Sequence, residues 1–366
     1  MLESWSPTMD SLPNQPTRAV VAVEAVDGEV RGAVRRALAA IDWQQVIPAG
    51  SAVSLKVNLG WDLFIPGSIT SPMFAEAVIL ELRDHVGKIY MVEADQVLEN
   101  VEKAFHDSGM SEVCRRTGVE WVNMSHAPYS QEEIPENKFL RSIEVPQILR
   151  QTLLITLPVM KTHAKTRLTG ALKNQWGCLN KMRHEYHLVL DDALAELNSI
   201  VRPRLCIMDG TVGLEGDGPK SGRPRVADRV LCSTDPVALD TIQAIIMGLD
   251  PATVTHLERC AARGVGTHDR QLIEVRGLQP EQDPVQFRPA KHNAVSRVET
   301  LLRKSTFKRL FFNTPLFHLC LFGAKIYYRL WTLGRAGRLW SDIRKHPVYG
   351  PQWKPGWPGL APPRTD

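Results

Sequence analysis

Residues 153–178 read LLITLPVMKTHAKTRLTGALKNQWGC, and this stretch decides the fold. It begins as a buried β-strand, because Leu and Ile dominate and no charged residue interrupts residues 153–160. Lysines, a histidine, an arginine and an asparagine follow within a few residues. In parallel α/β sheets, ligands bind beyond the carboxyl ends of the strands. The stretch therefore predicts a strand of such a sheet that leads directly into a site for something negatively charged.

The rest of the chain alternates between strand-like and helix-like patterns. Near-continuous apolar runs separated by helical periodicity indicate a parallel sheet that is covered on both faces. Ser71 and Asp235 are expected to act as helix N-caps, since each is followed by a proline at the first helical position. We expect strands at 18–25, 51–59, 88–95, 119–124, 152–158, 204–210 and 229–235, and helices at 29–42, 71–86, 100–109 and 236–249. The predicted fold class is α/β, with a largely parallel β-sheet, helices on both faces and a basic, aromatic C-terminal helical extension.

Composition sets the broad class of protein. The chain has 366 residues, 43% of them hydrophobic, and a net charge of +4, which alone does not indicate nucleic-acid binding. Its six cysteines are scattered without a CxxC pair, which favours a reduced, cytoplasmic setting and predicts no zinc or cluster framework. We expect a flexible tail at 1–17, an α/β domain at 18–290, a basic amphipathic helical extension at 297–345 and a Pro/Trp-rich tail at 346–366.

A series of motifs carries a family resemblance. The segments LKVNLG, LITLPVMKTH, LTGALKNQWG, MRHEYH, IMDGTVGLEGDGPKSG and STDPVALDTI follow one another in order. Together, across about residues 18–280, they resemble the domain-of-unknown-function family numbered 362. The resemblance implies a fold and the positions of a site, but no substrate. Some members of that family carry an added ferredoxin-like cluster domain. This chain lacks the closely spaced cysteines of that domain, so no iron–sulfur cluster is expected from it.

Cationic and amide side chains at the strand ends predict the ligand. Lysine acts as a point charge for carboxylates and phosphates, and backbone N–H groups at a helix start add donors. We expect a small anionic molecule to be bound by Lys56, Asn58, Lys161, Lys173 and Asn174. Proton transfer is expected from His163 or His184, because imidazole titrates near neutral pH. Lys165 and Arg167 are expected to lie in a solvated basic loop.

A divalent metal ion is a further candidate for this region. His184 and His187 are three residues apart ahead of an amphipathic helix, and hard cations prefer carboxylate ligands. The expected ligands are His187, Asp209 and Glu215, the last two from a glycine-rich loop at 208–224. In the alternative interpretation, Asp209 caps this loop and Glu215 is exposed to solvent. The loop lacks the motifs of phosphate-binding and dinucleotide-binding loops, and its glycines indicate backbone close to something.

Asp240 is expected to be partly buried, because apolar residues surround it in the sequence. A buried carboxylate requires a partner. Lys56 and Lys173 are the candidates for that partner.

The C-terminal segment has a different composition. Between residues 297 and 345 there are eleven Lys and Arg residues against two acidic ones, interleaved with aromatic residues. Its uncharged run between Arg309 and Lys325 has fifteen residues and contains Pro315, short of the ~20 needed to span a bilayer. Three interpretations remain open: a helix that packs on the α/β core, a helix on an anionic membrane surface, or a helix that binds a protein partner. Nucleic acid is not favoured, since no recognition motif accompanies the basic residues.

These observations lead to two hypotheses about function. The first is an enzyme that acts on a small carboxylate- or phosphate-bearing molecule, with proton abstraction, lyase and redox chemistry all open. The second is a non-catalytic binding or scaffold protein, attached through residues 297–345 to a complex or to the inner membrane surface. Substitution of the site lysines and removal of the C-terminal segment distinguish the two.

Overall fold

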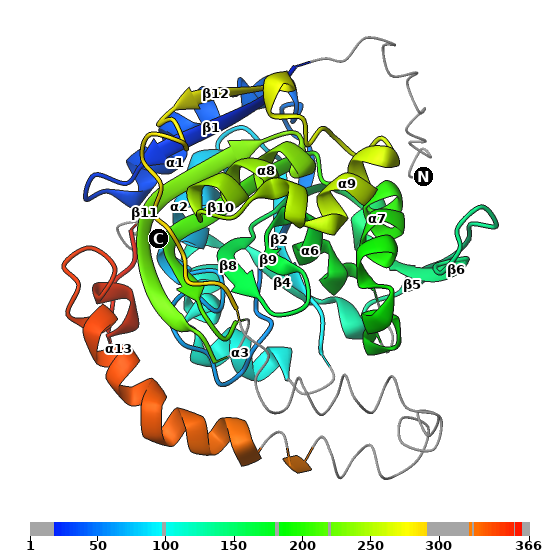
Figure 1. Ribbon diagram of the computed structural model, residues 1–366. Coiled ribbons are helices and arrows are strands. Elements are labelled where there is room, and N and C mark those ends of the chain that lie inside the picture. Colours follow the sequence, from blue (N-terminus) through cyan, green and yellow to red (C-terminus); the bar gives the residue numbers. More distant parts are fainter. Residues whose placement is uncertain are drawn as a thin grey trace.

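The computed structural model describes residues 18–96, 100–179, 183–218, 221–290, 322–323, 326–354 and 356–360, with only the backbone of residues 183–185 and 335. The expected tail at 1–17 and all residues from 291 to 321, which include the first half of the expected extension at 297–345, lie outside this range. The described residues form an α/β body with helices on both faces of one large sheet (Figure 1).

Within the described residues, the main sheet holds ten strands. Eight follow the order β12-β1-β11-β10-β7-β2-β3-β4, while β8 pairs with β10 and β9. The bounds are β1 (Ala19–Ala25), β2 (Ala52–Lys56), β3 (Lys88–Glu93), β4 (Glu120–Asn123), β7 (Leu153–Thr156), β8 (Val159–His163), β9 (Arg167–Thr169), β10 (Leu205–Glu215), β11 (Arg223–Ser233) and β12 (Ile273–Gly277). The pairs from β10 through β7, β2 and β3 to β4 are parallel, whereas β11 runs antiparallel to both β1 and β10. The predicted largely parallel sheet is confirmed.

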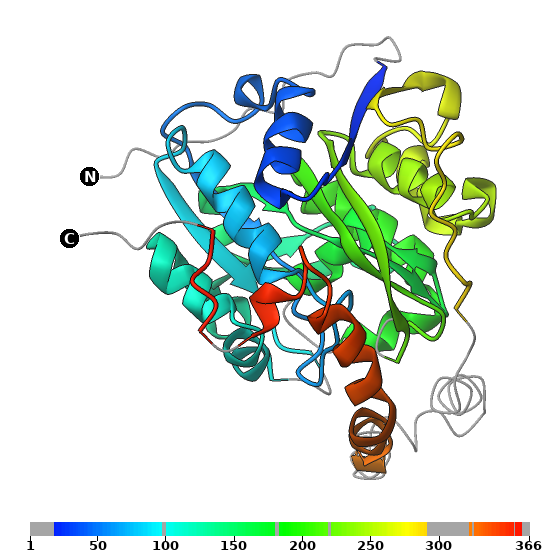
Figure 2. The same ribbon diagram turned by 90° about the vertical axis from the view of Figure 1, so that its left-hand side faces the viewer.

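Helices cover both faces of this sheet. Figure 2 shows the blue and cyan helices on one side and the yellow-green helices on the other. The first group is α1 (Val30–Ala39), α2 (Pro72–Leu82), α3 (Val101–Asp107) and α4 (Met110–Thr117). The second group is α6 (Ala171–Asn174), α7 (Leu190–Ile200), α8 (Pro236–Ile246) and α9 (Thr255–Ala262). The short elements are α5 (Ile148–Gln151), the hairpin β5 (Tyr129–Glu133) and β6 (Ser142–Pro146), and the 3₁₀ turns Trp43–Gln45, Met124–His126, Gln175–Cys178, Arg183–Leu188, Pro251–Thr253, Arg270–Leu272 and Pro351–Trp353.

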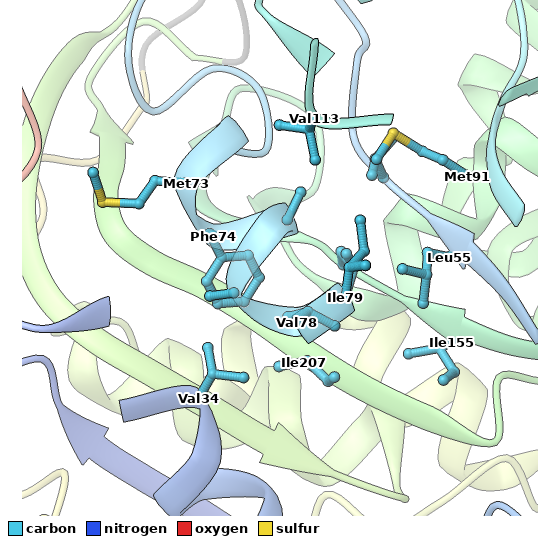
Figure 3. Close-up of a cluster of buried hydrophobic side chains, with 14 of the residues drawn as sticks. Val34, Leu55, Met73, Phe74, Val78, Ile79, Met91, Val113, Ile155 and Ile207 are labelled. Carbon is cyan, nitrogen blue, oxygen red and sulfur yellow. The ribbon is translucent and has the colours of Figure 1, made fainter. Parts of the chain in front are cut away.

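The strands supply alternate residues to two cores. Side chains along a strand point to opposite faces, so neighbouring residues enter different layers. In β10, Ile207 packs in the core beneath α1 and α2, and Met208 packs in the core beneath α8. Figure 3 shows the first core, where Phe74 and Val78 of α2 lie near Ile207. Burial on both faces explains why these strands read as continuous apolar runs.

Two predicted helix starts are confirmed in detail. The Ser71 hydroxyl accepts a hydrogen bond from the Phe74 N–H, and Pro72 is the first residue of α2. The Asp235 carboxylate accepts from the N–H groups of Val237 and Ala238, and α8 begins at Pro236. Caps of this kind satisfy backbone donors that have no partner inside the helix.

The glycine-rich stretch 208–224 corrects a prediction. Strand β10 continues to Glu215 and β11 starts at Arg223, so most of the expected loop is an antiparallel hairpin. Its glycines give room to neighbouring backbone. A Cβ atom on Gly213 would lie 2.5 Å from the Met160 carbonyl oxygen, and one on Gly218 would lie 2.2 Å from that of Thr162. The close approach inferred from these glycines is therefore to strand β8 of the same chain.

The described part of the C-terminal segment packs on the α/β body. It contains helical residues 326–331, the π-helical turn Thr332–Ala336 and helix α13 (Gly337–Arg344). Tyr328 meets Trp61 edge to face, with ring centroids 5.0 Å apart, and Trp340 packs on Phe64 at 5.7 Å. Tyr349 is fully buried and its hydroxyl donates to Asp228. One face of this segment therefore belongs to the core, as the first of the three interpretations expected.

Candidate functional site

Strand β8 carries the first predicted site residues. Lys161 pairs with Thr169 and His163 pairs with Arg167 across the antiparallel β8–β9 hairpin. Lys161 and His163 were expected to follow a strand, but they lie within one, because the chain resumes extended structure after Pro158. Residues at alternate positions of a strand share a face. The hairpin therefore presents Lys161 and His163 on one side, and its turn brings Lys165 close to them.

The charge of the Lys56 side chain is balanced by a carboxylate of the protein itself. Lys56 ends β2 and Glu93 ends the neighbouring β3, and their Nζ and Oε1 atoms are 2.7 Å apart. Both side chains are buried, and Lys56 also donates to the Val57 carbonyl at 2.9 Å. The Glu93 carboxylate accepts from the N–H groups of Leu59 and Ala94. This pair is a structural part of the sheet edge.

A buried amide network joins three more of the predicted residues. Lys161 Nζ donates to Asn58 Oδ1 at 2.9 Å and to the Ser68 carbonyl at 2.8 Å. Asn58 donates to Asn174 Oδ1 at 3.0 Å. The Asn174 amide in turn donates to the Lys56 carbonyl at 3.0 Å and to Thr156 Oγ1 at 2.9 Å. Since a fully bonded buried network is rigid, it fixes the position of the Lys161 charge.

Four more cationic or imidazole side chains lie near Lys161 of this network. We call Lys161, His163, Lys165, Lys173 and His187 together the cationic cluster. Lys165 Nζ lies 2.8 Å from His187 Nδ1, and Lys173 Nζ donates to Thr166 Oγ1 at 3.1 Å. The side chains of His163, Lys165, Lys173 and His187 are each partly exposed. The cluster is thus built from β8, the β8–β9 turn, α6 and the turn before α7.

Burial and mutual repulsion lower the pKa values of two members of the cationic cluster, His163 and Lys173. Burial is the main cause that places the pKa of His163 well below its ordinary value, and Lys173, Lys165, His187 and Lys161 add to the effect. The pKa of Lys173 is also well below the ordinary lysine value, first through burial and then through Lys165 and Lys161. Asp191 opposes this shift without cancelling it. Like charges held together in this way favour a bound anion, which would relieve their repulsion.

Hydrogen bonds assign the tautomer of His163. Its Nδ1 atom accepts from the N–H groups of Lys165 at 3.0 Å and Thr166 at 3.3 Å. In a neutral imidazole one nitrogen accepts and the other carries the proton, so Nε2 is the donor. His163 is therefore arranged as a neutral hydrogen-bond donor. His184, the other predicted proton carrier, lies in the turn Arg183–Leu188, and its side chain is outside the described residues.

Asp240 corrects another expectation. It is buried in α8, as predicted, but its partners are the N–H groups of Ala171 at 2.6 Å and Leu172 at 3.0 Å, rather than a lysine. Burial is the main reason why its pKa rises to about 7. A Cβ atom on Gly170 would lie 2.2 Å from Asp240 Oδ1, so this contact needs glycine. Asp240 thus holds the first turn of α6, which carries Lys173 and Asn174.

The three expected metal ligands have different surroundings. His187 lies in the cationic cluster. Asp209 is buried in β10, where it accepts from the N–H groups of Ser71 and Thr211, and burial raises its pKa. Glu215 accepts from the Arg288 N–H and lies 3.6 Å from the Arg288 guanidinium. Within the described residues, no three His, Cys, Asp or Glu side chains are grouped so that they could hold a metal ion.

The structure brings to the cationic cluster two residues, Lys165 and Thr166, that the sequence did not assign to the site. Lys165 was expected in a solvated loop, but it is partly buried and contacts His187, whereas Arg167 is exposed as expected. The i, i+2 spacing of Lys161 and His163 was a signal for their shared face, whereas Lys165 is brought close by the β8–β9 turn. Nothing in the sequence marked Thr166 as the acceptor for Lys173.

Comparison with known proteins places this arrangement in a family. Residues 53–244 match the family described as Domain of unknown function (DUF362). The chain is also similar to a thylakoid-associated protein of Synechocystis sp., with 27% identity over 259 residues, covering 64% of this chain and 78% of that protein. The family match spans β2 to α8, and so includes every member of the cationic cluster. The chain belongs to the family described as Domain of unknown function (DUF362).

Proposed function

We propose that this protein is an enzyme that binds a small carboxylate- or phosphate-bearing molecule in the cationic cluster. The observation that carries the proposal is the lowered pKa of both His163 and Lys173, caused by burial together with neighbouring cations. Burying these protonatable groups beside other cations costs free energy in the unliganded protein. An anion would offset that cost, and perturbed pKa values of this kind gather at functional sites.

The geometry suggests a role for each side chain. Lys161, fixed by Asn58 and the Ser68 carbonyl, would hold the anionic group as a point charge. His163 would donate from Nε2 to an oxygen on which charge develops. Lys173, with its lowered pKa, would act as the general base in its neutral form. Proton abstraction is therefore the reaction type that the cluster favours among the three that the sequence left open.

Anion titration of the purified protein tests this function. We expect calorimetry to detect binding of inorganic phosphate or acetate. Lys165→Met should weaken it about 10- to 100-fold through the loss of one charged hydrogen bond, and Lys173→Met should weaken it less, because a neutral amine donates a weaker bond. Lys103→Met is the matched control, because Lys103 is an exposed lysine on α3 that pairs with Asp107. Equal binding by all four proteins would overturn the proposed site, as would a folded wild-type protein that binds neither anion.

A second proposal concerns where the protein acts. We propose that it attaches peripherally to a membrane surface, either as this enzyme or as a non-catalytic scaffold. The name of the Synechocystis relative, which is described as thylakoid-associated, favours this location. None of the helices in the described residues has both the length and the apolar character needed to cross a bilayer. Fractionation of cells that produce the protein should find it with membranes, from which high salt releases it.

A further inference from the structure

Large apolar side chains are exposed on a single helical segment. Among the described residues, six large hydrophobic side chains are exposed, and five of the six lie between residues 322 and 333. The most exposed are Phe322 at 62%, Leu330 at 65% and Leu333 at 82%. Single exposed apolar residues are normal on a protein surface, but a group of this kind marks an interaction site.

Helical geometry places these side chains in one row. Ile326, Leu330 and Leu333 are spaced by four and three residues, which is the spacing of one helix face, and Phe322 lies four residues before Ile326 in the sequence. We call these four residues the apolar stripe. Tyr328, on another face of the same helix, packs on Trp61, and Ala336 is buried with Ile65 and Leu214. The helix is therefore apolar on two faces, and the stripe points away from the body.

The charges beside the apolar stripe indicate its partner. Arg329, which precedes Leu330 of the stripe in the sequence, and Arg338, which follows the stripe, are exposed. Arg344 is exposed as well, with its guanidinium 4.9 Å from the Trp340 ring centroid. Among the described residues from 326 to 345, Asp342 is the exposed acid. A basic helix with aliphatic and aromatic residues on its apolar face is typical of segments that lie in the interface of an anionic bilayer. A second copy of the chain would bring these arginines together and be repelled. Figure 2 shows the helix, in orange to red, projecting at the rim of the molecule, where a flat surface could reach it.

We propose that the apolar stripe inserts into the headgroup–acyl boundary of an anionic membrane, with the arginines beside it on the lipid phosphates. This inference rests on the peripheral attachment proposed above and is independent of the anion site. It identifies the contact surface as the four exposed side chains of the apolar stripe, on a segment that Tyr328 holds to the body. The helix would lie parallel to the membrane plane, since none of the described helices is long and apolar enough to span a bilayer.

Vesicle binding tests the stripe with the full chain. The probes are vesicles of phosphatidylcholine alone and vesicles that also contain phosphatidylglycerol. We expect co-sedimentation with the anionic vesicles, and an at least tenfold lower partition coefficient for the double variant Leu330→Asp/Leu333→Asp. Leu188→Asp is the matched control, because Leu188 is the exposed large apolar residue outside the segment, at 52%. It should bind vesicles as the wild type does. Arg329→Gln/Arg338→Gln should weaken binding to the anionic vesicles and reduce its salt dependence.

Each outcome separates the claims. Retained binding by the double aspartate variant would overturn the stripe but leave peripheral attachment standing. Absence of vesicle binding by the wild type would overturn both. A wild-type dimer that the double variant converts to a monomer would assign the stripe to a second copy, and equal binding to neutral vesicles would overturn the role of the arginines. Phosphate titration of the double aspartate variant and of the arginine variant should be unchanged, which keeps the anion site separate.

Discussion

Lys56 and Lys173 lie close together in the fold but differ in the partners of their amino groups. Lys56 is buried against Glu93 at 2.7 Å, with the backbone around the pair satisfying its other bonds. Lys173 is partly exposed, bonds to a threonine hydroxyl and has its pKa lowered by burial and by neighbouring lysines. Both were predicted to bind the anion. A lysine with a buried carboxylate partner is therefore part of the scaffold, whereas the lysine that lies among other cations is the one at which we propose that the anion binds.

The largest expected effect comes from breaking the buried pair. Lys56→Ala leaves the Glu93 charge buried without its partner, so the free energy of unfolding should fall by about 3–5 kcal/mol. Chemical denaturation measures this loss. The double variant Lys56→Met/Glu93→Leu should recover much of it, because no charge then remains unpaired. A single variant as stable as wild type would return Lys56 to the list of ligand-binding residues.

Substitution of Gly177, which packs against the Lys56–Glu93 pair, tests how tightly that pair is held. A Cβ atom at this position would lie 2.5 Å from Glu93 Oε1 and 2.6 Å from Lys56 Nζ. Gly177→Ala should therefore destabilise the protein by about 1–3 kcal/mol, since the ion pair must move. Gly337→Ala is the control, because its Cβ atom meets nothing within 4 Å and α13 is helical there. That variant should be slightly more stable in thermal denaturation. Equal effects at both glycines would show that the pair tolerates displacement.

Acid should destabilise the cationic cluster through His163. Its pKa is lowered in the folded protein, so below about pH 6.5 the unfolded chain binds a proton that the folded protein does not. Stability is then lost as pH falls, with a slope of at most about 1.4 kcal/mol per pH unit. The difference between wild type and His163→Gln, from denaturation between pH 5 and pH 7, isolates this contribution. Saturating phosphate should reduce it, and identical slopes in the two proteins would show that His163 is not responsible.

The smallest effect has the opposite sign to the first. Lys173→Met removes an amine whose pKa is lowered in the folded protein, so the unfolded chain no longer gains a proton that the fold resists, and the free energy of unfolding should rise by about 1 kcal/mol. The change in the free energy of unfolding should therefore be negative for the Lys56 variant and positive for the Lys173 variant when the two are measured side by side. A Lys173 variant that is destabilised by several kcal/mol would mean that this lysine also belongs to the scaffold.

Sequence periodicity predicted the sheet well, because strands buried on both faces leave long apolar runs. It failed at the β10–β11 hairpin, where glycines and acidic residues resemble a loop. Gly213 and Gly218 are there because strand β8 passes within contact distance, which is a tertiary cause that no local pattern contains. In the same way, the β-branched and polar residues of 159–169 gave no sign that the chain would turn back as a second hairpin.

Sequence reasoning placed several of the candidate residues in one region but did not predict their hydrogen-bond partners. Strand-end reasoning brought Lys56, Asn58, Lys161 and Asn174 into one region, and the structure joins them by hydrogen bonds. Which lysine meets a carboxylate depends on the neighbouring strand, and the partner of Asp240 depends on how α8 approaches α6. These contacts join residues that are far apart in the sequence. The sequence therefore could not distinguish a lysine with a buried carboxylate partner from the lysines of the cationic cluster.

The position of β1 has a consequence for how the protein is made. This strand is synthesised early, yet it lies between β11 and β12, and the Ser233 hydroxyl bonds to the Val20 carbonyl 213 residues away. At about 5–20 residues per second on the ribosome, β1 waits roughly 10–40 s for its neighbours. During that interval its edges are open to wrong pairings. Nascent chains of this protein should therefore depend on chaperones more than chains whose first strands pair locally.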